Sequence, residues 1–132
     1  MSVYENLKKL NLEIPKAPDP VGAYIAYKKT ENLLFISGQI SIDSNGKITK
    51  GKLGKDLTID QGQAAAKLCA INIIAQTKKA CNERLENIAN CIKLTGYVNS
   101  TTNLLINLKL SIPLLNLFLL YLARTVNTQE RQ

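Results

Sequence analysis

The residue types best suited to acid–base and nucleophilic chemistry are scarce in this 132-residue chain. It contains no histidine and only three cysteines, Cys69, Cys81 and Cys91. The lack of histidine excludes Ser-His and Cys-His nucleophile pairs and every metal site that uses imidazole. Three cysteines without C-x-x-C spacing are too few for a cysteine-only zinc site. We therefore expect neither a metal nor a cofactor.

The charge balance favours anionic partners without identifying one. The 17 Lys and Arg outnumber the 10 Asp and Glu, which gives a formal net charge of +7. A basic surface steers anions toward a protein but does not make a specific site. The lysines are scattered and Arg84 is the only arginine before residue 124. We interpret them as a solvated surface, without a nucleic-acid partner.

Cysteine usage and the start of the chain indicate a compartment. An odd number of cysteines fits a reducing environment, where disulfides do not persist. The first residues, Met1–Leu10, lack the basic-then-apolar pattern of a secretory signal. We expect a cytoplasmic protein with no membrane partner.

Two capping boxes predict the helices that would position any site. Ser2 is followed three residues later by Glu5, which predicts a short helix that runs through Leu10. Thr58 and Gln61 have the same spacing and open the longest predicted helix, about Ile59 to Cys81.

The long helix has an expected apolar side made of Ala65, Leu68, Cys69, Ile73 and Ala80. Its expected solvent side carries Lys67, Asn72, Gln76 and Lys79. We interpret Cys69 and Cys81 as small core residues and not as nucleophiles.

Alternating apolar and polar residues predict strands around this helix. The expected strands are Ala23–Tyr27, Leu33–Ile42, a weak Lys47–Leu53, and Ala89–Asn99. A polar turn at residues 28–32 separates the first two, and Asp43–Gly46 forms the next turn. The order strand, strand, strand, helix, strand predicts an α+β domain with a helix on one face of a sheet.

Five phrases of the sequence, in order, carry a family resemblance. They are Pro20–Tyr24, Asn32–Ile40, Gly51–Leu57, Gly62–Ala66 and Lys93–Ser100. Together they resemble the RidA family (YjgF, or endoribonuclease L-PSP), in its longer branch. The resemblance covers residues 1–103 and implies a chorismate-mutase-like fold. That fold is a mixed sheet with helices on one face, assembled as a homotrimer with clefts between subunits.

The resemblance also implies an activity and its residues. Archetypal members hydrolyse 2-enamines and 2-imines, such as 2-aminoacrylate, to a 2-keto acid and ammonia. Tyr24 corresponds to the family's pocket tyrosine and is our candidate catalytic residue. Ser37 and Gly38 correspond to the pocket edge and are our candidate substrate-binding residues. The implied ligand is a small 2-imino or 2-keto acid.

The resemblance ends at Asn103, and residues 104–132 have a different character. Ten of the thirty residues from Asn103 onward are leucine. A family member should instead continue with an Asn-Phe-Thr-like opening, a Val-Ile-Asn segment, a second helix, a His-x-Arg segment and two final strands. We predict that this C-terminal helix and these strands are lost or replaced.

A one-base deletion accounts for the change. Residues 103–112 can be written AAT TTA CTA ATC AAC CTA AAG TTA TCA ATC. Restoring one T gives AAT TTT ACT AAT CAA CCT AAA GTT ATC AAT. This line reads Asn-Phe-Thr-Asn-Gln-Pro-Lys-Val-Ile-Asn, the expected family segment. Arg124 and Arg131 are then out-of-frame residues, and the family's carboxylate-binding arginine is missing. We predict negligible deaminase activity for the 132-residue chain.

Three other functions stay open at this stage. The chain could be a non-enzymatic trimeric binder of small metabolites, or an RNA-binding or endoribonuclease-like protein. It could also be the functionless product of a broken gene. A twenty-residue apolar stretch at Leu104–Ala123 superficially resembles a membrane span, but Pro113 and several polar residues weaken that reading.

Overall fold

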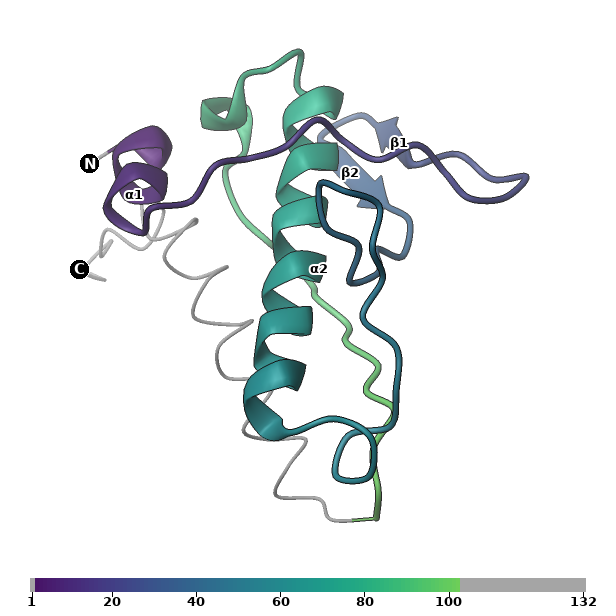
Figure 1. Ribbon diagram of the computed structural model, residues 1–132. Helices are drawn as coiled ribbons and strands as arrows, with labels where there is room; N and C mark the ends of the chain where they lie inside the picture. The colour runs from purple at the N-terminus through teal and green to yellow at the C-terminus, as the bar shows by residue number, and fades with distance from the viewer. Residues whose placement is uncertain (1, 103–132) are drawn as a thin grey trace, which may run out of the picture.

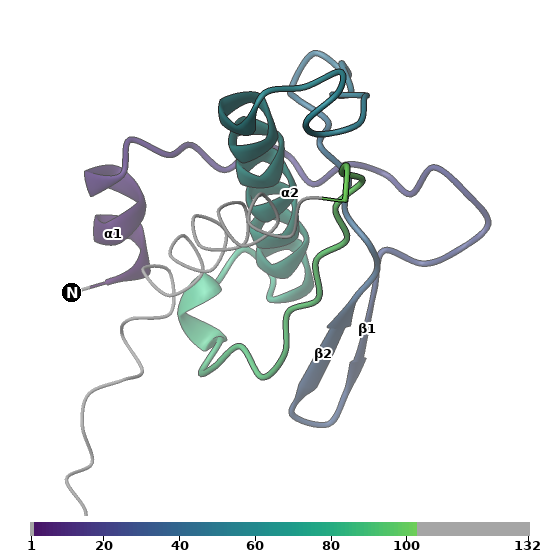
Figure 2. The ribbon, with the colours of Figure 1, turned by 90° about the horizontal axis from the view of Figure 1, so that it is seen from below.

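The computed structural model describes residues 2–102, in which a long helix lies between a short helix and a β-hairpin (Figure 1). The elements in chain order are α1 (Val3–Lys9), β1 (Tyr27–Thr30), β2 (Leu33–Ile36), α2 (Ile59–Ala80) and the 3-10 helix η1 (Leu85–Asn87). The hairpin packs on α2. Two views agree that α1 lies on the opposite side of α2 (Figures 1 and 2). The predicted α+β class is confirmed.

Both helices begin at the predicted capping boxes. At α1, the Glu5 amide donates to Ser2 Oγ (3.1 Å) and the Ser2 amide donates to the Glu5 carboxylate (2.6 Å). At α2, the Gln61 amide donates to Thr58 Oγ1 (3.2 Å) and the Thr58 amide donates to Gln61 Oε1 (2.8 Å). These bonds satisfy amides that the first helical turn leaves without partners.

Both helices also end in the same motif, built on an asparagine. Asn11 and Asn82 have φ angles of 51° and 52°, in the left-handed region that asparagine tolerates. The next residue then donates back into the helix. Leu12 N lies 2.9 Å from Leu7 O, and Glu83 N lies 2.9 Å from Lys78 O. This Schellman geometry caps carbonyls that would otherwise be unpaired.

The hairpin corrects the strand bounds that the sequence pattern predicts. Its antiparallel register pairs Tyr27 with Ile36 and Thr30 with Leu33. The turn is therefore only Glu31 and Asn32, with Glu31 at φ 49°, whereas a turn over residues 28–32 was expected. The prediction was wrong because a run of polar residues can lie on a strand that faces solvent, as residues 28–30 do.

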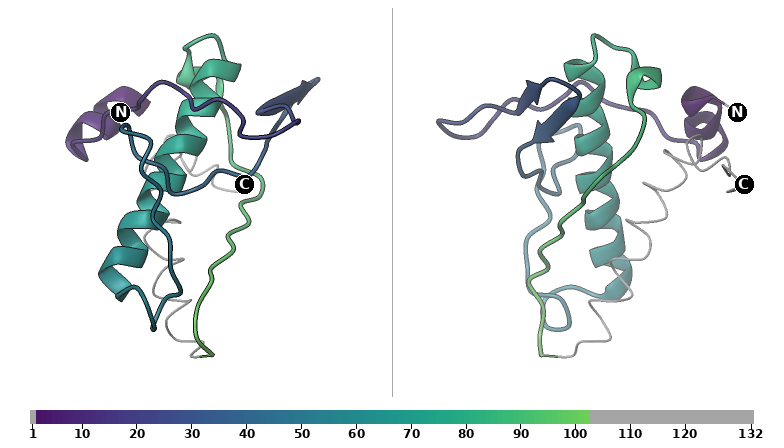
Figure 3. Two further views of the ribbon diagram at one scale, coloured as in Figure 1. Left: turned by 45° about the vertical axis from the view of Figure 1, so that its right-hand side comes forward. Right: turned by 180° about the vertical axis from the view of Figure 1, so that it is seen from behind.

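The other predicted strands do not form ladders within residues 2–102. Residues 47–53 make isolated bridges, Ile42 with Ile48 and Leu53 with Ser100. The predicted strand Ala89–Asn99 is extended chain that runs along α2 (Figure 3). It is held at its end, where Leu53 N donates to Asn99 O and Thr101 N donates to Leu53 O, both at 2.9 Å. Alternation had indicated an extended segment correctly, but a strand also requires a partner.

Asn72 and Gln76 are buried on α2, although both were expected to face solvent. Asn72 Nδ2 donates to the carbonyls of Ile40 (3.1 Å) and Ile42 (3.0 Å), and Gln76 Nε2 donates to Pro18 O (2.6 Å). The segments that contain Pro18, Ile40 and Ile42 are neither helix nor strand. Their backbone carbonyls therefore need other donors where these segments pack on α2. The two amides, one helical turn apart, supply them.

The apolar core lies where α1, the C-terminal half of α2 and η1 meet. Val3, Leu7, Ile74 and Leu85 form it. Leu12 and Ile14 pack against this cluster from the segment that follows α1. No helix within the described residues is both long enough and apolar enough to cross a membrane.

Candidate functional site

The three candidate site residues flank the two strands of the hairpin in sequence, at the end opposite its two-residue turn; Figure 2 shows the hairpin. Tyr24 comes shortly before β1, and Ser37 and Gly38 directly follow β2. Two hydrogen bonds from Ser37 hold the segments before β1 and after β2 together at this end. Its amide donates to Ala26 O (2.9 Å) and its hydroxyl donates to Ile25 O (2.5 Å).

Tyr24 is placed by a tight local turn. Its amide donates to Gly22 O at 2.8 Å. A Cβ at Gly22 would lie only 3.2 Å from Cδ1 and Cε1 of the Tyr24 ring, so glycine lets the ring lie over the backbone. The side chain is half exposed. A phenol in this position presents a hydroxyl that can both donate and accept a hydrogen bond.

Ser37 and Gly38 leave room and an acceptor directly after β2. The Ser37 hydroxyl already donates to Ile25 O, so it offers its lone pairs to a further donor. A Cβ at Gly38 would meet nothing within 4 Å, so the space in front of this residue is open. Together these groups can orient a small polar molecule or a water, but none of them carries a charge.

The site lies on an exposed apolar surface. Around the hairpin, Val21, Ile25 and Phe35 are 80%, 62% and 60% exposed, and Leu33 and Ile40 are each 43% exposed. A surface this apolar on one chain is typical of a subunit contact. The hairpin that Ser37 and Gly38 follow therefore has exposed apolar side chains around it on a single chain.

The arginine within residues 2–102 takes part in a long ion pair at the surface. Arg84 follows α2, and its recorded ion pair joins Nε to the Glu86 carboxylate at 4.0 Å. No contact recorded within residues 2–102 connects a guanidinium with Tyr24, Ser37 or Gly38. A bidentate carboxylate clamp would have to come from elsewhere.

All three cysteines are free thiols: Cys69 and Cys81 are half-buried and not core residues as predicted, and Cys91 as a whole is exposed. Burial raises the pKa of the Cys69 thiol and of the Cys91 thiol. Burial also raises the pKa of Cys81, and the Lys29 ammonium partly opposes that rise. A raised pKa keeps the thiol protonated near neutral pH. The part of the chain described here also contains no cluster of three His, Cys, Asp or Glu side chains that could hold a metal.

Comparison with known proteins decides the family. The sequence model for the family described as "YjgF/chorismate_mutase-like, putative endoribonuclease" matches residues 5–122. The chain belongs to this family. This match extends to residue 122. It therefore continues past residue 103, the point at which the resemblance in individual motifs stops.

Relatives of this YjgF-family chain support the same fold. The Trypanosoma cruzi protein TCP17 is 34% identical over 99 residues, which span 75% of this chain and 61% of TCP17. The chain thus covers about three-fifths of that relative. A crystal structure of a putative endoribonuclease from Shewanella oneidensis superposes with a TM-score of 0.86 at 30% identity, covering 95% of this chain and 82% of the other.

A second solved structure agrees. Protein Atu1372 of Agrobacterium tumefaciens, described as having unknown function, gives a TM-score of 0.80 at 34% identity, covering 93% of this chain and 76% of the other. The chorismate-mutase-like fold expected from the sequence is therefore confirmed. The names of these relatives do not identify a small-molecule substrate.

Asn72, Gln76 and Gly22 are structural supports of the site region that sequence reasoning missed. The two amides hold the segments on either side of the hairpin, and Gly22 seats the Tyr24 ring. Amide side chains four residues apart on a helix were the available signal, because that spacing places them on one face.

Proposed function

We propose that this chain descends from a 2-enamine/2-imine deaminase and retains one wall of its substrate site. The proposal is supported by the two hydrogen bonds from Ser37 to Ile25 and Ala26, which hold the start of the Ser37–Gly38 segment against the residues that follow Tyr24, in a chain of the YjgF family. The ligand would be a small 2-imino or 2-keto acid that lies against this wall.

The proposed reaction requires few catalytic groups from the protein. A 2-enamine tautomerises to the 2-imine, water adds to the C=N carbon, and the C–N bond of the resulting carbinolamine breaks. The products are a 2-keto acid and ammonia, so one water is consumed and no oxidant is needed. A phenol and a hydroxyl that hold the water and the imine in place supply orientation, which is the main contribution required.

The apolar surface around the hairpin supports a homotrimer with its site between subunits. A second chain packed on Val21, Ile25 and Phe35 would cover these exposed apolar side chains. The proposed cellular location is the cytoplasm.

The 132-residue chain itself should turn over substrate negligibly. The proposed frame break removes the segment that would bring a guanidinium to the substrate carboxylate, and Arg84 is paired with Glu86 instead. Loss of a charge-assisted bidentate pair weakens both binding and orientation of the substrate. The remaining wall would bind ligand without completing the reaction.

The test compares two proteins from one gene. We would purify the 132-residue chain and a chain with one T restored after the Asn103 codon, and measure keto-acid release from enzymatically generated 2-aminoacrylate. We expect turnover by the restored chain alone, and a marked loss when it carries Tyr24→Phe. Near-normal turnover by the 132-residue chain would contradict the proposed frame break. No turnover by the restored chain would contradict the deaminase proposal.

RNA binding or cleavage is the second candidate, favoured by the net charge of +7 and by the description of the Shewanella protein as a putative endoribonuclease. Binding to phosphates weakens steeply as salt rises. Strong, salt-dependent affinity of the purified chain for RNA oligomers would support this candidate. Stabilisation by 2-keto acids in a thermal-shift screen, without RNA binding, would support a metabolite site.

A further inference from the structure

A cavity of about 330 Å³ lies on the side of α2 away from the hairpin. It is a hollow, open to solvent on one side, where α1 and the segment after it meet the C-terminal end of α2 and η1. A pocket of a few hundred Å³ is large enough for a small molecule, since ligand sites begin at about 300 Å³. Tyr24, Ser37 and Gly38 do not line it, so it is separate from the proposed deaminase site.

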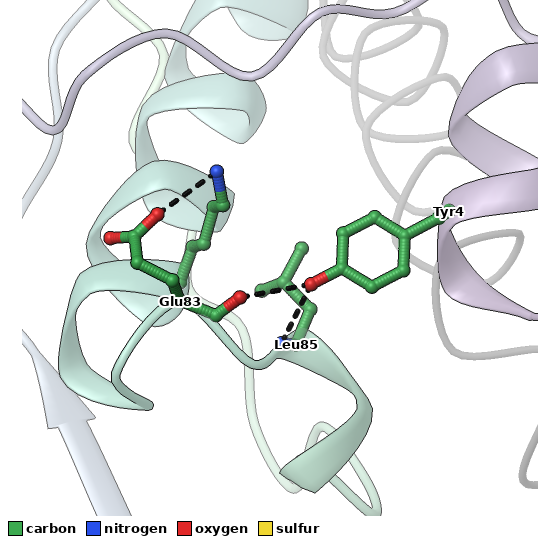
Figure 4. Close-up of polar contacts among 4 residues, drawn as sticks. Tyr4, Glu83 and Leu85 are labelled. Carbon is green, nitrogen blue, oxygen red and sulfur yellow. Dashed lines mark hydrogen bonds and ion pairs between the residues drawn. The ribbon is translucent and has the colours of Figure 1, made fainter.

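The cavity walls are fixed by specific hydrogen bonds. Tyr4 reaches across from α1, and its hydroxyl donates to Glu83 O (2.9 Å) and accepts from Leu85 N (3.4 Å), as Figure 4 shows. The Schellman motif at the end of α1 turns the chain so that Leu12 comes back to Leu7. The cavity is thus built by elements that are tied together.

The lining combines an apolar floor with opposite charges. Leu7, Leu12, Ile14 and Leu85 provide the floor. Lys78 is also part of the wall, but its ammonium is engaged by the Glu83 carboxylate at 3.0 Å. Lys8 and Glu13 also line the cavity, and neither has a recorded ion pair within residues 2–102. One cation and one anion are thus available beside an apolar floor.

We propose that this cavity binds an apolar α-amino acid. The ligand carboxylate would face the Lys8 ammonium, its ammonium would face the Glu13 carboxylate, and its side chain would lie on the leucine floor. A purely anionic ligand would pair with Lys8 but be repelled by Glu13, and a purely cationic ligand would pair with Glu13 but be repelled by Lys8. Because Lys8 and Glu13 are both exposed, each ion pair is screened by water and the affinity is weak, in the millimolar range.

The test is an NMR titration of the full ¹⁵N-labelled chain with L-leucine. Three probes each lack one feature: glycine lacks the apolar chain, 4-methylpentanoate the ammonium, and isopentylamine the carboxylate. We expect saturable shifts at Leu7, Leu12 and Leu85 with leucine, and at least threefold weaker binding of every other probe. Equal binding of glycine and leucine, or shifts outside the cavity, would overturn the proposal.

Matched variants test the charges. We expect Lys8→Gln and Glu13→Gln each to weaken leucine binding by about two- to fivefold, the usual worth of an exposed pair. Lys9→Gln removes the same charge from the same helical turn outside the cavity and should leave binding unchanged, as should Asp19→Asn for the acid. If neither Lys8→Gln nor Glu13→Gln weakens binding, the assignment is wrong. Tyr24→Phe should have no effect, which separates this site from the proposed function.

Discussion

Ser37 fixes the open end of the hairpin through both its backbone and its side chain. Replacing it with alanine removes the hydroxyl that donates to Ile25 O and leaves the amide bond to Ala26 intact. We expect Ser37→Ala to lower the free energy of unfolding by about 1 kcal/mol, the net worth of one such bond. Urea denaturation measures this change. Ser44→Ala in the exposed turn is the control, and equal effects of the two variants would contradict the role of Ser37.

Asn72 makes a larger contribution because it is buried and donates twice. Asn72→Ala leaves the carbonyls of Ile40 and Ile42 without these donors. We expect a loss of about 2–3 kcal/mol in the free energy of unfolding, since unpaired buried groups keep their desolvation cost. Lys67→Ala, on the exposed side of the same helix, should change stability little. A loss below that of Ser37→Ala would show that the irregular segments do not depend on Asn72.

At the scale of elements, the cap of α1 predicts how stability depends on pH. The hydrogen bond from the Ser2 amide, the largest influence, holds the pKa of Glu5 below its ordinary value. A carboxyl whose pKa is lower in the folded state stabilises the fold above its unfolded pKa, and this contribution is lost as pH falls through the lowered folded value.

Glu5→Gln tests this contribution. Glutamine keeps an oxygen that can accept from the Ser2 amide but does not titrate. We expect the wild-type chain to be more stable than the variant near neutral pH, and the difference to shrink in the acid range. Thermal unfolding at several pH values measures it, with Glu31→Gln in the hairpin turn as the control. A difference that stays constant with pH would contradict the linkage.

The helices were predictable and the sheet was not, for a physical reason. A capping box contains its own donors and acceptors within four residues, so Ser2 and Thr58 fix where α1 and α2 begin. A strand is completed only by a partner that can be far away in sequence. The pattern at residues 89–99 therefore predicted the extended backbone but could not supply the missing ladder. Burial of Asn72 and Gln76 escaped prediction because residue type alone says nothing about nearby carbonyls.

At the scale of the whole molecule, the candidate site came from the family resemblance and not from local chemistry. Tyr24, Ser37 and Gly38 are uncharged residue types, and residue type alone would not mark any of them as a candidate site residue. The fold brings them to one end of the hairpin. The sequence could not predict what covers the exposed apolar side chains around the hairpin, because such a cover depends on contacts with residues outside the motif.

The extended segment at residues 89–98 offers the sharpest test of that frame break. Ile92 and Tyr97 are 79% and 94% exposed, an unfavourable surface for a strand of the family sheet. A chain with one T restored would regain strands able to pair with this segment. We expect its amides at Ile92–Val98 to exchange hydrogen at least about 100-fold more slowly than in the 132-residue chain.

Hydrogen exchange followed by mass spectrometry measures this difference, and peptides from α2 should be protected in both chains because their hydrogen bonds lie within one helix. Equal protection of residues 92–98 in the two chains would mean that the replaced segment is not the missing partner. Resequencing the gene across the codons for Thr102–Leu105 then decides the origin of the tail. One additional T would make the restored chain the natural protein. The T count implied by the present sequence would make the 132-residue chain the product of a broken gene.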